Sequence, residues 1–404
     1  MARPLRVAHI ITKLAVGGAQ ESALVTLTGL DAEAFDQWLV CGTEVDDEGS
    51  LRPAADEAGV RVVDVPCLVR AVSPVADLRA VAALRDHFRR ERPDIVHTHS
   101  SKAGFIGRAA ARSAGIPVVV HSVHGWSFHP EMRPSLRRAV VAAERIAARG
   151  TTVLVHEGVP DRAKGLDQGI GDPGQYVLVR NGIDLGAFSA EVDDVEPGQV
   201  RRSLGVPDGA WLLGTVGRLA DQKAPLAMVD AVAPLMKGSR DLWFVWVGDG
   251  PLRDAVAEKA AALGIAPRFR LAGVRRDVPA VLRAMDTFVL SSLWEGLPRT
   301  VTEAMASSVP VVATAVDGVA EVVDDGVSGL LVPPHDAGAL GRAIQRVRED
   351  DGLRARLAAA GVGRAQEFDR SEMLRRLADL YRGLAGGSTP AEVAAGWSST
   401  PAWS

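Results

Sequence analysis

Short apolar segments recur along the whole chain and are separated by amphipathic stretches. The apolar segments are rich in β-branched residues and nearly continuous, as strands buried on both faces of a parallel sheet are. Amphipathic stretches such as residues 74–93 have helical spacing. The alternation predicts a doubly wound parallel α/β sheet. The expected strands are RVAHIIT, QWLVC, VRVVDV, DIVHTH, PVVVHSV, TVLVH and YVLVR in the first half, and WLLGTVG, LWFVWVG, RFRLAG, TFVLSS, VPVVAT and SGLLVP in the second.

The chain is longer than one sheet of this kind needs. A length of 404 residues suits two domains. Residues 183–200 are acidic, contain Pro and Gly and lack a clear period, which predicts a linker. We therefore expect a first Rossmann-like domain over residues 1–185 and a second over residues 196–370. Residues 386–404 are rich in Gly, Ser, Thr and Pro, so we expect a flexible tail unless one of its tryptophans docks.

Composition and charge narrow the function classes. The net charge of −4 gives no electrostatic basis for binding nucleic acid. Cys41 and Cys67 have no metal-ligand spacing and are expected to be reduced thiols of a cytoplasmic protein. The basic start precedes an apolar run over only Val7 to Thr12, so we interpret it as a strand and not as a signal peptide. No stretch approaches the roughly 20 apolar residues that span a bilayer.

Glycines and histidines follow the strands of the first half, where ligands of open parallel sheets bind. Gly17 and Gly18 open a helix, so they either bring N–H groups to a phosphate or only reverse the chain. His99 and His124 lie at strand ends and are expected near the ligand. No Cys/His set has zinc spacing, so a metal site is not expected. Three further histidines within strands are interpreted as hydrogen-bonded core residues, namely His9, His97 and His121.

Two cations follow the first strand of the second half. Arg218 and Lys223 lie five positions apart beside a glycine turn and form a candidate clamp for a diphosphate. The alternative is a solvated pair on a loop. Gly248 starts a Gly-Asp-Gly-Pro turn that resembles the beginning of a dinucleotide fingerprint. The third glycine of that fingerprint is missing, which disfavours a NAD-dependent dehydrogenase.

The most specific pattern is SSLWEGLPRTVTEAMA, residues 291–306. Glu295 lies in a loop after a strand, and Glu303 lies in the helix that follows. A loop carboxylate can bind sugar hydroxyls, a carboxylate early in a helix can accept the hydroxyls of a ribose, and N–H groups at the helix start can hold phosphate oxygens. One pocket would then match all parts of a nucleotide sugar. Surface glutamates on an ordinary helix explain the pattern poorly, because both lie beside an apolar run.

The order of these motifs resembles the retaining GT-B glycosyltransferases of family 4. The run from Glu295 to Glu303, followed by ASSVPVVAT, carries the resemblance, and seven other blocks agree in order over almost the whole chain. The blocks are Gly17-Gly18-Ala19-Gln20, DIVHTHSSKAG, Val123-His124-Gly125-Trp126, Asn181-Gly182-Ile183-Asp184, Gly217-Arg218-Leu219 with Gln222-Lys223, Gly248-Asp249-Gly250-Pro251, and Gly273 with Asp277-Val278. One departure is Ala224 after Lys223, where the family often has glycine.

The resemblance implies a fold and a mechanism. Two Rossmann-like domains would face each other across a deep interdomain cleft, and a helix over about 371–385 would return to the first domain. Arg218 and Lys223 would bind the donor diphosphate and stabilise the leaving group in place of a metal ion. Glu295 would contact the transferred sugar, and His124 would lie over it. Configuration at the anomeric carbon would be retained, and no cofactor or metal is expected.

Other residues are expected to contact substrate without taking part in the chemistry. Glu303 would hold the ribose, and Gly17 and Gly18 would close the site from the first domain. Val274 and Arg275 would offer backbone contacts to the base. The remaining expected substrate contacts are His99, Gly248, Gly296, Leu297, Pro298, Thr300 and Val301.

The predicted function is transfer of a hexose or N-acetylhexosamine from a nucleotide diphosphate sugar to a hydroxyl acceptor. UDP-GlcNAc and UDP-Glc are the expected donors, and glycan, lipid or secondary-metabolite precursors the expected acceptors. One alternative of the same fold is a sugar-nucleotide 2-epimerase, which would need carboxylates suited to proton abstraction. The other is a non-catalytic nucleotide-sugar-binding protein, which would be expected to lose a clamp residue.

A basic segment over residues 133–149 leaves two interpretations open. It carries five arginines with apolar residues between them. Such a helix either makes a weak peripheral contact with anionic lipid or packs on the sheet with its arginines in water, and packing on the sheet is the favoured interpretation.

Overall fold

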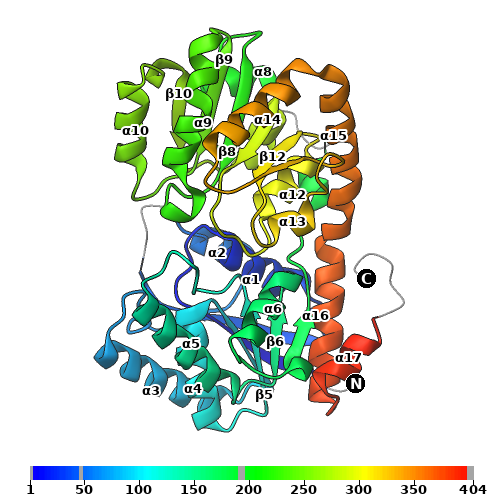
Figure 1. The fold of residues 1–404 in the computed structure, drawn as a ribbon. Helices are drawn as coiled ribbons and strands as arrows, with labels where there is room; N and C mark the ends of the chain where they lie inside the picture. Colours follow the sequence, from blue (N-terminus) through cyan, green and yellow to red (C-terminus); the bar gives the residue numbers. More distant parts are fainter. Residues whose placement is uncertain (1–2, 45–48, 190–195, 398–404) are drawn as a thin grey trace. The chain divides into compact units, whose positions relative to one another are not determined.

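The computed structural model describes residues 3–44, 49–189 and 196–397. The chain forms two compact units (Figure 1). The first contains the residues up to Asn181 together with those from Arg370 onward, and the second contains Gly182–Asp369. The chain thus leaves the first unit once and returns to it near its end.

The first unit is built on a seven-stranded sheet in the order β3-β2-β1-β4-β5-β6-β7, with parallel neighbours throughout. Its strands are β1 (Leu5–Ile11), β2 (Phe35–Cys41), β3 (Val62–Asp64), β4 (Ile95–His99), β5 (Val118–Val123), β6 (Val153–His156) and β7 (Tyr176–Leu178). Its helices are α1 (Gly18–Gly29), α2 (Arg52–Glu57), α3 (Pro74–Glu91), α4 (Ser101–Ala114), α5 (Pro134–Ala148), α6 (Val159–Asp167), α16 (Arg370–Ala385) and α17 (Pro390–Ala395).

Both faces of this sheet are covered, as its nearly continuous apolar strands predict. Val7 of β1 packs on one face in a core that includes Tyr381 of α16. Its neighbour Ala8 packs on the opposite face in a core that includes Phe88 of α3. Successive residues of a strand point to opposite faces, so each strand serves two cores at once.

The second unit repeats the arrangement with a six-stranded parallel sheet in the order β10-β9-β8-β11-β12-β13. Its strands are β8 (Trp211–Val216), β9 (Leu242–Val247), β10 (Phe269–Gly273), β11 (Thr287–Leu290), β12 (Val311–Thr314) and β13 (Leu330–Val332). Its helices are α7 (Leu185–Phe188), α8 (Pro197–Ser203), α9 (Pro225–Gly238), α10 (Arg253–Ala262), α11 (Val278–Arg283), α12 (Arg299–Ala306), α13 (Val319–Val322), α14 (Ala337–Glu349) and α15 (Asp351–Ala365). The two sheets confirm the predicted doubly wound α/β class.

The segment predicted as a linker is folded where the structure describes it. Ile183, Phe188 and Val200 are buried in the core of the second unit, and α7 and α8 form around them. Residues 190–195 lie outside the described residues. These three widely spaced apolar side chains anchor the stretch to the core of the second unit, although its sequence is acidic and has no clear period.

The flexible tail expected from residue 386 is not found over residues 386–397. Helix α17 begins with a capping box between Thr389 and Glu392 and packs against β7. Trp397 is only 7% exposed, and the Arg376 guanidinium lies 5.1 Å from its ring centre. The docked tryptophan therefore fixes this part of the tail. Residues 398–404 lie outside the described residues.

A buried ion pair joins α4 and α5. Arg108 Nη2 donates to Glu144 Oε2 at 2.7 Å, and both side chains are 1% exposed. Arg108 Nε also donates to the Gly104 carbonyl oxygen at 2.9 Å. Burial raises the pKa of Glu144, and the charge of Arg108 opposes that shift. Neither charge reaches water, so each depends on the other for its stability.

We expect Arg108→Met to lower the free energy of unfolding of the first unit by about 3–5 kcal/mol, because it leaves a buried carboxylate without its counter-charge. The double variant Arg108→Met/Glu144→Leu should recover most of this loss, since an apolar pair carries no cost of burying charge. Urea unfolding of the wild type, both single variants and the double variant measures the effect. A double variant whose loss equals the sum of the two single losses would contradict the coupling.

Candidate functional site

Each sheet reverses its strand order at one place, and three of the candidate residues, Arg218, Lys223 and Glu295, follow the two strands at the reversal of the second sheet. The reversal falls between β1 and β4 in the first unit and between β8 and β11 in the second. Loops leave the two central strands in opposite directions at such a point and make room for a ligand at the carboxyl ends. Arg218 and Lys223 follow β8, and Glu295 follows β11. The second sheet therefore gathers these side chains at one edge.

Lys223 and Glu295 form an ion pair. Lys223 Nζ donates to Glu295 Oε1 at 2.5 Å, with the two side chains 15% and 7% exposed. Ser292 Oγ donates to the same oxygen at 2.6 Å, and Gln222 Nε2 donates to Oε2 at 3.3 Å. We call these four residues the Lys223–Glu295 cluster. It joins a predicted ligand of the diphosphate to a predicted ligand of the sugar, and three donors fix the carboxylate in one orientation.

The loop that carries Lys223 is held in an unusual conformation. Ser291 Oγ donates to the Lys223 carbonyl oxygen at 2.7 Å. Ala224 has a φ of 44°, in the left-handed region, and Pro225 starts α9 directly after it. A residue with a Cβ atom pays about 1–2 kcal/mol for this conformation. This is the position where the sequence departs from glycine, and here an alanine adopts the left-handed conformation.

The loop after β12 supports the loop of Glu295. Asp317 Oδ2 accepts from the Glu295 N–H at 3.2 Å. A Cβ atom added at Gly318 would lie 2.0 Å from the Gly296 carbonyl oxygen, so only glycine fits there. The Leu297 side chain is buried in the core of the second unit. Its side chain thus anchors the loop, and its predicted substrate contact is limited to its backbone.

The glycine turn after β9 supports the loop of Arg218. A Cβ atom at Gly248 would lie 2.2 Å from the Gly217 carbonyl oxygen, and one at Gly250 would lie 2.6 Å from that of Leu219. The Gly248 N–H donates to the Gly273 carbonyl oxygen at 2.8 Å. Gly248 was expected to contact substrate, but its N–H is engaged and its backbone packs against the clamp loop. Its role in the structure is to let two backbones approach closely.

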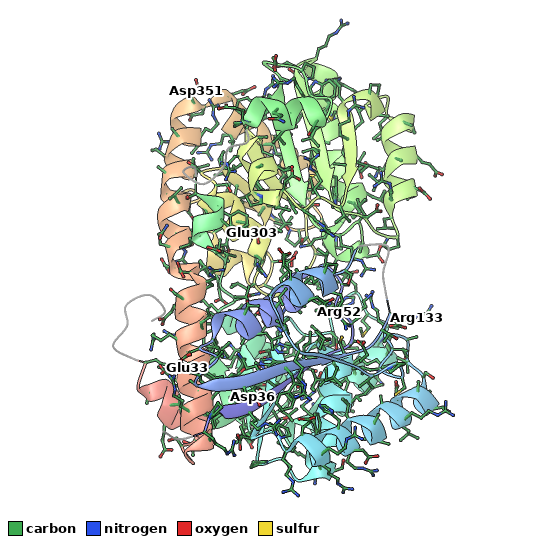
Figure 2. The ribbon with its side chains drawn as sticks, turned by 180° about the vertical axis from the view of Figure 1, so that it is seen from behind. Glu33, Asp36, Arg52, Arg133, Glu303 and Asp351 are labelled. Carbon is green, nitrogen blue, oxygen red and sulfur yellow. The ribbon has the colours of Figure 1, made fainter. Side chains whose placement is uncertain are left out.

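Helix α12 carries Glu303 (Figure 2). The Glu303 side chain is buried, and its Oε1 lies 3.6 Å from Arg299 Nη2. Thr300 Oγ1 is buried and has no hydrogen-bond partner within the described part of the chain, so it offers a polar atom to a ligand. Val301 differs from its prediction, because its side chain is in the core and its N–H donates to the Pro298 carbonyl oxygen at 3.0 Å. The helix itself uses that N–H.

The predicted base contacts follow β10 at the same edge of the sheet. Val274 is 42% exposed. Arg275 donates to both oxygens of Asp277, at 2.8 and 2.5 Å, and holds the pKa of that carboxyl below its usual range. The guanidinium is therefore occupied, and a contact between a base and the backbone of this pair stays a prediction.

In the first unit, the predicted glycines start α1. Gly17 is the N-cap residue, and its carbonyl oxygen accepts from the Glu21 N–H at 2.9 Å. Gly18 is the first helical residue. The two glycines lie in the turn after β1, at the strand reversal of the first sheet. A phosphate contact through this turn stays a prediction.

One face of the first sheet carries polar side chains on four neighbouring strands, β2, β1, β4 and β5, and Glu157 follows the next strand, β6. His9 of β1 pairs in register with His97 of β4, so the two share a face, and His99 lies two residues further on the same face. In the β1–β2 register, Gln37 of β2 pairs with Val7, two residues before His9. Gln37 and His9 therefore lie on the same face of the sheet. The registers of β4, β5 and β6 extend the row toward the carboxyl edge.

Five of these side chains form a continuous series of hydrogen bonds, which we call the histidine chain. His9 Nε2 lies 3.1 Å from Gln37 Oε1, and His9 Nδ1 lies 3.1 Å from His99 Nε2. His99 Nδ1 lies 3.1 Å from His124 Nε2, and His124 Nδ1 lies 2.7 Å from Glu157 Oε1. Burial lowers the pKa of His9 to about 4 and the pKa of His99 well below its usual value. Both are therefore neutral near pH 7.

His99 lies behind His124 and not at the surface where it was expected. The His99 side chain is 2% exposed and both of its nitrogens are engaged, whereas the His124 side chain is 10% exposed. His99 therefore supports His124 and does not itself face a substrate. His97 and His121 are buried and hydrogen-bonded, as interpreted from the sequence.

Three imidazoles come closer together than the sequence spacing indicated. Ligand nitrogens of His9, His97 and His99 lie within 4.8 Å of one another. His97 bonds with Tyr381 at 2.5 Å and with Ser122 at 2.8 Å, and the other two rings belong to the histidine chain. All six ring nitrogens thus have hydrogen-bond partners, so a metal ion would have to displace several of them.

Sequence reasoning assigned no role to the residues that orient the candidate side chains, although two of them, Gln222 and Ser292, lie within its motifs. These are Gln37 and Glu157 in the first unit and Gln222, Ser292 and Asp317 in the second. Glu157, Ser292 and Asp317 lie within three residues of a strand end, which is a usable signal. Ser292 and its partner Glu295 lie in the same loop. The other partners lie on or after a different strand, so the strand order must be known before those pairs can be found.

Family comparisons cover most of both units. Residues 17–182 match the family described as glycosyl transferase 4-like domain, and residues 211–350 match the family described as glycosyl transferases group 1. The UDP-Gal:alpha-D-GlcNAc-diphosphoundecaprenol alpha-1,3-galactosyltransferase of Escherichia coli is 33% identical over 350 residues, which cover 86% of this chain and 88% of that protein. A D-inositol 3-phosphate glycosyltransferase of Actinosynnema mirum is 32% identical over 306 residues, or 71% of this chain and 72% of that protein.

Solved structures share the fold at low sequence identity. Anabaena Alr3699/HepE in complex with UDP and glucose matches with a TM-score of 0.80 and 22% identity, over 93% of this chain and 98% of that chain. Sucrose-phosphate synthase from Thermosynechococcus elongatus matches with a TM-score of 0.78 and 21% identity, over 95% of this chain and 100% of that chain. The fold is the two-domain, Rossmann-like GT-B fold. The chain belongs to the group 1 glycosyltransferases and is an enzyme of the glycosyltransferase class.

Proposed function

We propose that this enzyme transfers a hexose or N-acetylhexosamine from a UDP-sugar to a hydroxyl acceptor, with retention of configuration and without a metal ion. The Lys223–Glu295 cluster carries the proposal. It places a cation suited to a diphosphate 2.5 Å from a carboxylate suited to sugar hydroxyls, at the strand reversal of the second sheet. Arg218 lies on the same loop as Lys223 and adds a second cation.

The surroundings of the cluster fit the rest of the donor. The buried Glu303 carboxylate lies on the helix that follows Glu295, where it would accept the ribose hydroxyls. Thr300 Oγ1, buried and without a protein partner in the described residues, would bond to a phosphate oxygen at the start of α12. The E. coli relative is a UDP-Gal-dependent galactosyltransferase. This supports UDP as the nucleotide, and makes galactose a candidate sugar beside glucose and GlcNAc.

The chemistry follows from charges already in place. As the sugar–phosphate bond breaks, negative charge grows on the leaving diphosphate, and Arg218 and Lys223 would stabilise it as a metal ion does elsewhere. Both oxygens of Glu295 already accept hydrogen bonds. This disfavours Glu295 as a nucleophile. We therefore propose front-face attack, in which the acceptor hydroxyl gives its proton to an oxygen of the leaving phosphate.

The surface of the first unit supports a lipid-linked acceptor. On α5, Leu136 and Ile146 are 53% and 63% exposed, and the exposed arginines beside them are Arg133, Arg138, Arg145 and Arg149. The opposite side of α5 is buried through Val141 and Glu144. An apolar stripe flanked by arginines fits the headgroup region of an anionic membrane. We propose a peripheral contact through this face; among the described residues, no helix is long and apolar enough to cross a membrane.

A second exposed apolar group extends this surface. Val72, Val75 and Leu78, at the start of α3, are 88%, 60% and 73% exposed. Helices α3 and α5 lie on either side of α4 (Figure 1). Crossover helices run opposite to the parallel strands, so both helices start near the carboxyl edge, where the acceptor is expected.

The purified enzyme should hydrolyse at least one of UDP-Gal, UDP-Glc and UDP-GlcNAc in the absence of acceptor, at the same rate with and without EDTA. The reason is that Arg218 and Lys223 supply the positive charge. Released UDP is the readout, and GDP-mannose is the control for the base. Activity that disappears with EDTA and returns with Mg²⁺ or Mn²⁺ would disprove the metal-independent clamp.

The two glutamates should fail in different ways. Glu303 is assigned to the ribose, which does not react, so Glu303→Ala should raise the donor KM more than it lowers kcat and should weaken UDP binding. Glu295 is assigned to the reacting sugar, so Glu295→Gln should lower kcat by roughly 100-fold with little change in UDP affinity. Steady-state kinetics and calorimetry with UDP measure both. A collapse of UDP affinity in Glu295→Gln alone would mean that the two roles are reversed, and a sugar adduct on Glu295 would exclude front-face attack.

The enzyme should sediment with anionic vesicles and much less with neutral ones. Leu136→Asp/Ile146→Asp should abolish this binding because it places charge in the apolar stripe. Val327→Asp is the matched control, since Val327 is a 59% exposed apolar residue of the second unit. Equal sedimentation with both vesicle types, or an unaffected double variant, would refute the membrane surface.

A further inference from the structure

The orientation of the Gln37 amide is set by helix α1. Its Nε2 atom lies 3.5 Å from the carbonyl oxygens of both Thr26 and Leu27, and its Oε1 atom faces His9 Nε2 at 3.1 Å. Exchange of the amide nitrogen and oxygen would turn the oxygen toward two other acceptors. Gln37 Oε1 is therefore the acceptor of the first bond in the histidine chain, and His9 Nε2 carries the hydrogen.

This direction passes along the chain because the next two rings are neutral. A neutral His9 with hydrogen on Nε2 has a bare Nδ1, so His99 Nε2 must donate to it. A neutral His99 with hydrogen on Nε2 likewise has a bare Nδ1, so it must accept from His124 Nε2. His124 therefore uses its Nε2 hydrogen in the bond to His99.

The last bond needs one hydrogen more than neutral histidines supply. Four hydrogen bonds connect the five side chains, and three neutral histidines bring only three hydrogens. His124 Nδ1 and Glu157 Oε1 lie 2.7 Å apart, and a bare ring nitrogen and a carboxylate cannot bond to each other. An additional proton must lie between them. An imidazole is a stronger base than a carboxylate, so this proton belongs to the ring.

We propose that Glu157 is a positioning residue that holds His124 as an imidazolium, with the direction of the chain fixed by Gln37. The side chains of His124 and Glu157 are 10% and 7% exposed, so water and salt screen the pair little. The other titratable groups that interact with His124 from β4 and β5 are His97, His99 and His121. Burial lowers the pKa of all three well below the usual value, so they carry no competing charge.

The consequence for catalysis rests on the proposed function and on the expectation, implied by the family resemblance, that His124 lies over the transferred sugar. Both nitrogens of His124 are engaged, so it neither gives nor takes a proton there. In the expected position it would instead present a fixed cationic ring to a donor that carries two phosphates. Negative charge on the diphosphate grows as the sugar leaves, so this cation acts more strongly in the transition state than in the bound donor.

Glu157→Gln separates the charge from the geometry. The amide group of the glutamine can donate to a bare His124 Nδ1, so every bond of the chain can form with a neutral His124. The variant thus keeps the shape of the chain and removes its additional proton. Glu33→Gln is the matched control, because Glu33 is an exposed glutamate of the same unit that is not part of the histidine chain (Figure 2).

Nitrogen-15 NMR of the histidine-labelled full chain tests the proton directly. The protein has nine histidines, and comparison with His124→Gln identifies the signals that belong to His124. Near pH 7, both nitrogens of His124 should be protonated in the wild type and in Glu33→Gln, and only Nε2 in Glu157→Gln. A His124 ring that is neutral in the wild type, or that remains an imidazolium in Glu157→Gln, would overturn the proposal.

A substitution at Gln37, at the opposite end of the histidine chain from Glu157, tests the direction of its hydrogen bonds. Gln37→Leu removes the acceptor at the inner end, so the three rings can reverse and bond throughout with Nδ1–H groups that end on the Glu157 carboxylate. His124 should then be neutral with hydrogen on Nδ1, although its own partners are unchanged. A His124 that is still doubly protonated in a folded Gln37→Leu would show that Gln37 does not fix the direction.

Kinetics separate this inference from the proposed function. Glu157→Gln should lower kcat by roughly tenfold, with a smaller change in donor KM. Unchanged kcat with the predicted NMR result would refute the positioning role while the protein remains a transferase. Absence of turnover with every donor in the wild type would instead refute the proposed function, and the NMR result would stand on its own.

Discussion

The burial of parallel strands on both faces is the constraint on which the rest of this structure depends. A strand such as β1 has apolar partners above and below, so charged groups are excluded from most of its length. The carboxyl ends of the strands escape this exclusion, because loops diverge there where the strand order reverses. The chemistry of both units is therefore gathered at the same kind of place, and residues far apart in the sequence meet there.

The Lys223–Glu295 cluster shows how charge is kept at such an edge. An ion pair with little exposure costs free energy unless its remaining hydrogen-bonding capacity is satisfied. Ser292 and Gln222 provide that satisfaction for the carboxylate. The resulting group is rigid and close to neutral. A donor with two phosphates would therefore meet a lysine whose position is already fixed, which reduces the cost of ordering it on binding.

The sequence was sufficient to predict features whose signal is local. It was insufficient to predict contacts that depend on which strands are neighbours. Apolar runs predicted both sheets, and the run from Glu295 to Glu303 predicted the edge where the second site lies. The contact between Lys223 and Glu295 joins the loops of two strands that are adjacent only because of the strand order. His99 was misplaced for the same reason. Its exposure depends on His124, which follows the next strand, β5, and bonds to it. The docking of Trp397 likewise depends on a partner, Arg376, that composition does not reveal.

The histidine chain shows why a polar network can persist inside such a core. Each buried imidazole must have both nitrogens satisfied, and a neutral ring satisfies them only with one donor and one acceptor. The direction of every bond is then fixed by the direction of its neighbour, so Gln37 and Glu157 at the two ends constrain one another across the sheet. Replacement of one ring by an apolar residue would leave two polar atoms of its neighbours without partners, each at a cost of about 1–3 kcal/mol. Loss of any one of the five residues therefore leaves its neighbours without partners. In the proposed network, the orientation of the Gln37 amide, which α1 sets, determines the protonation of His124 at the carboxyl edge of the sheet.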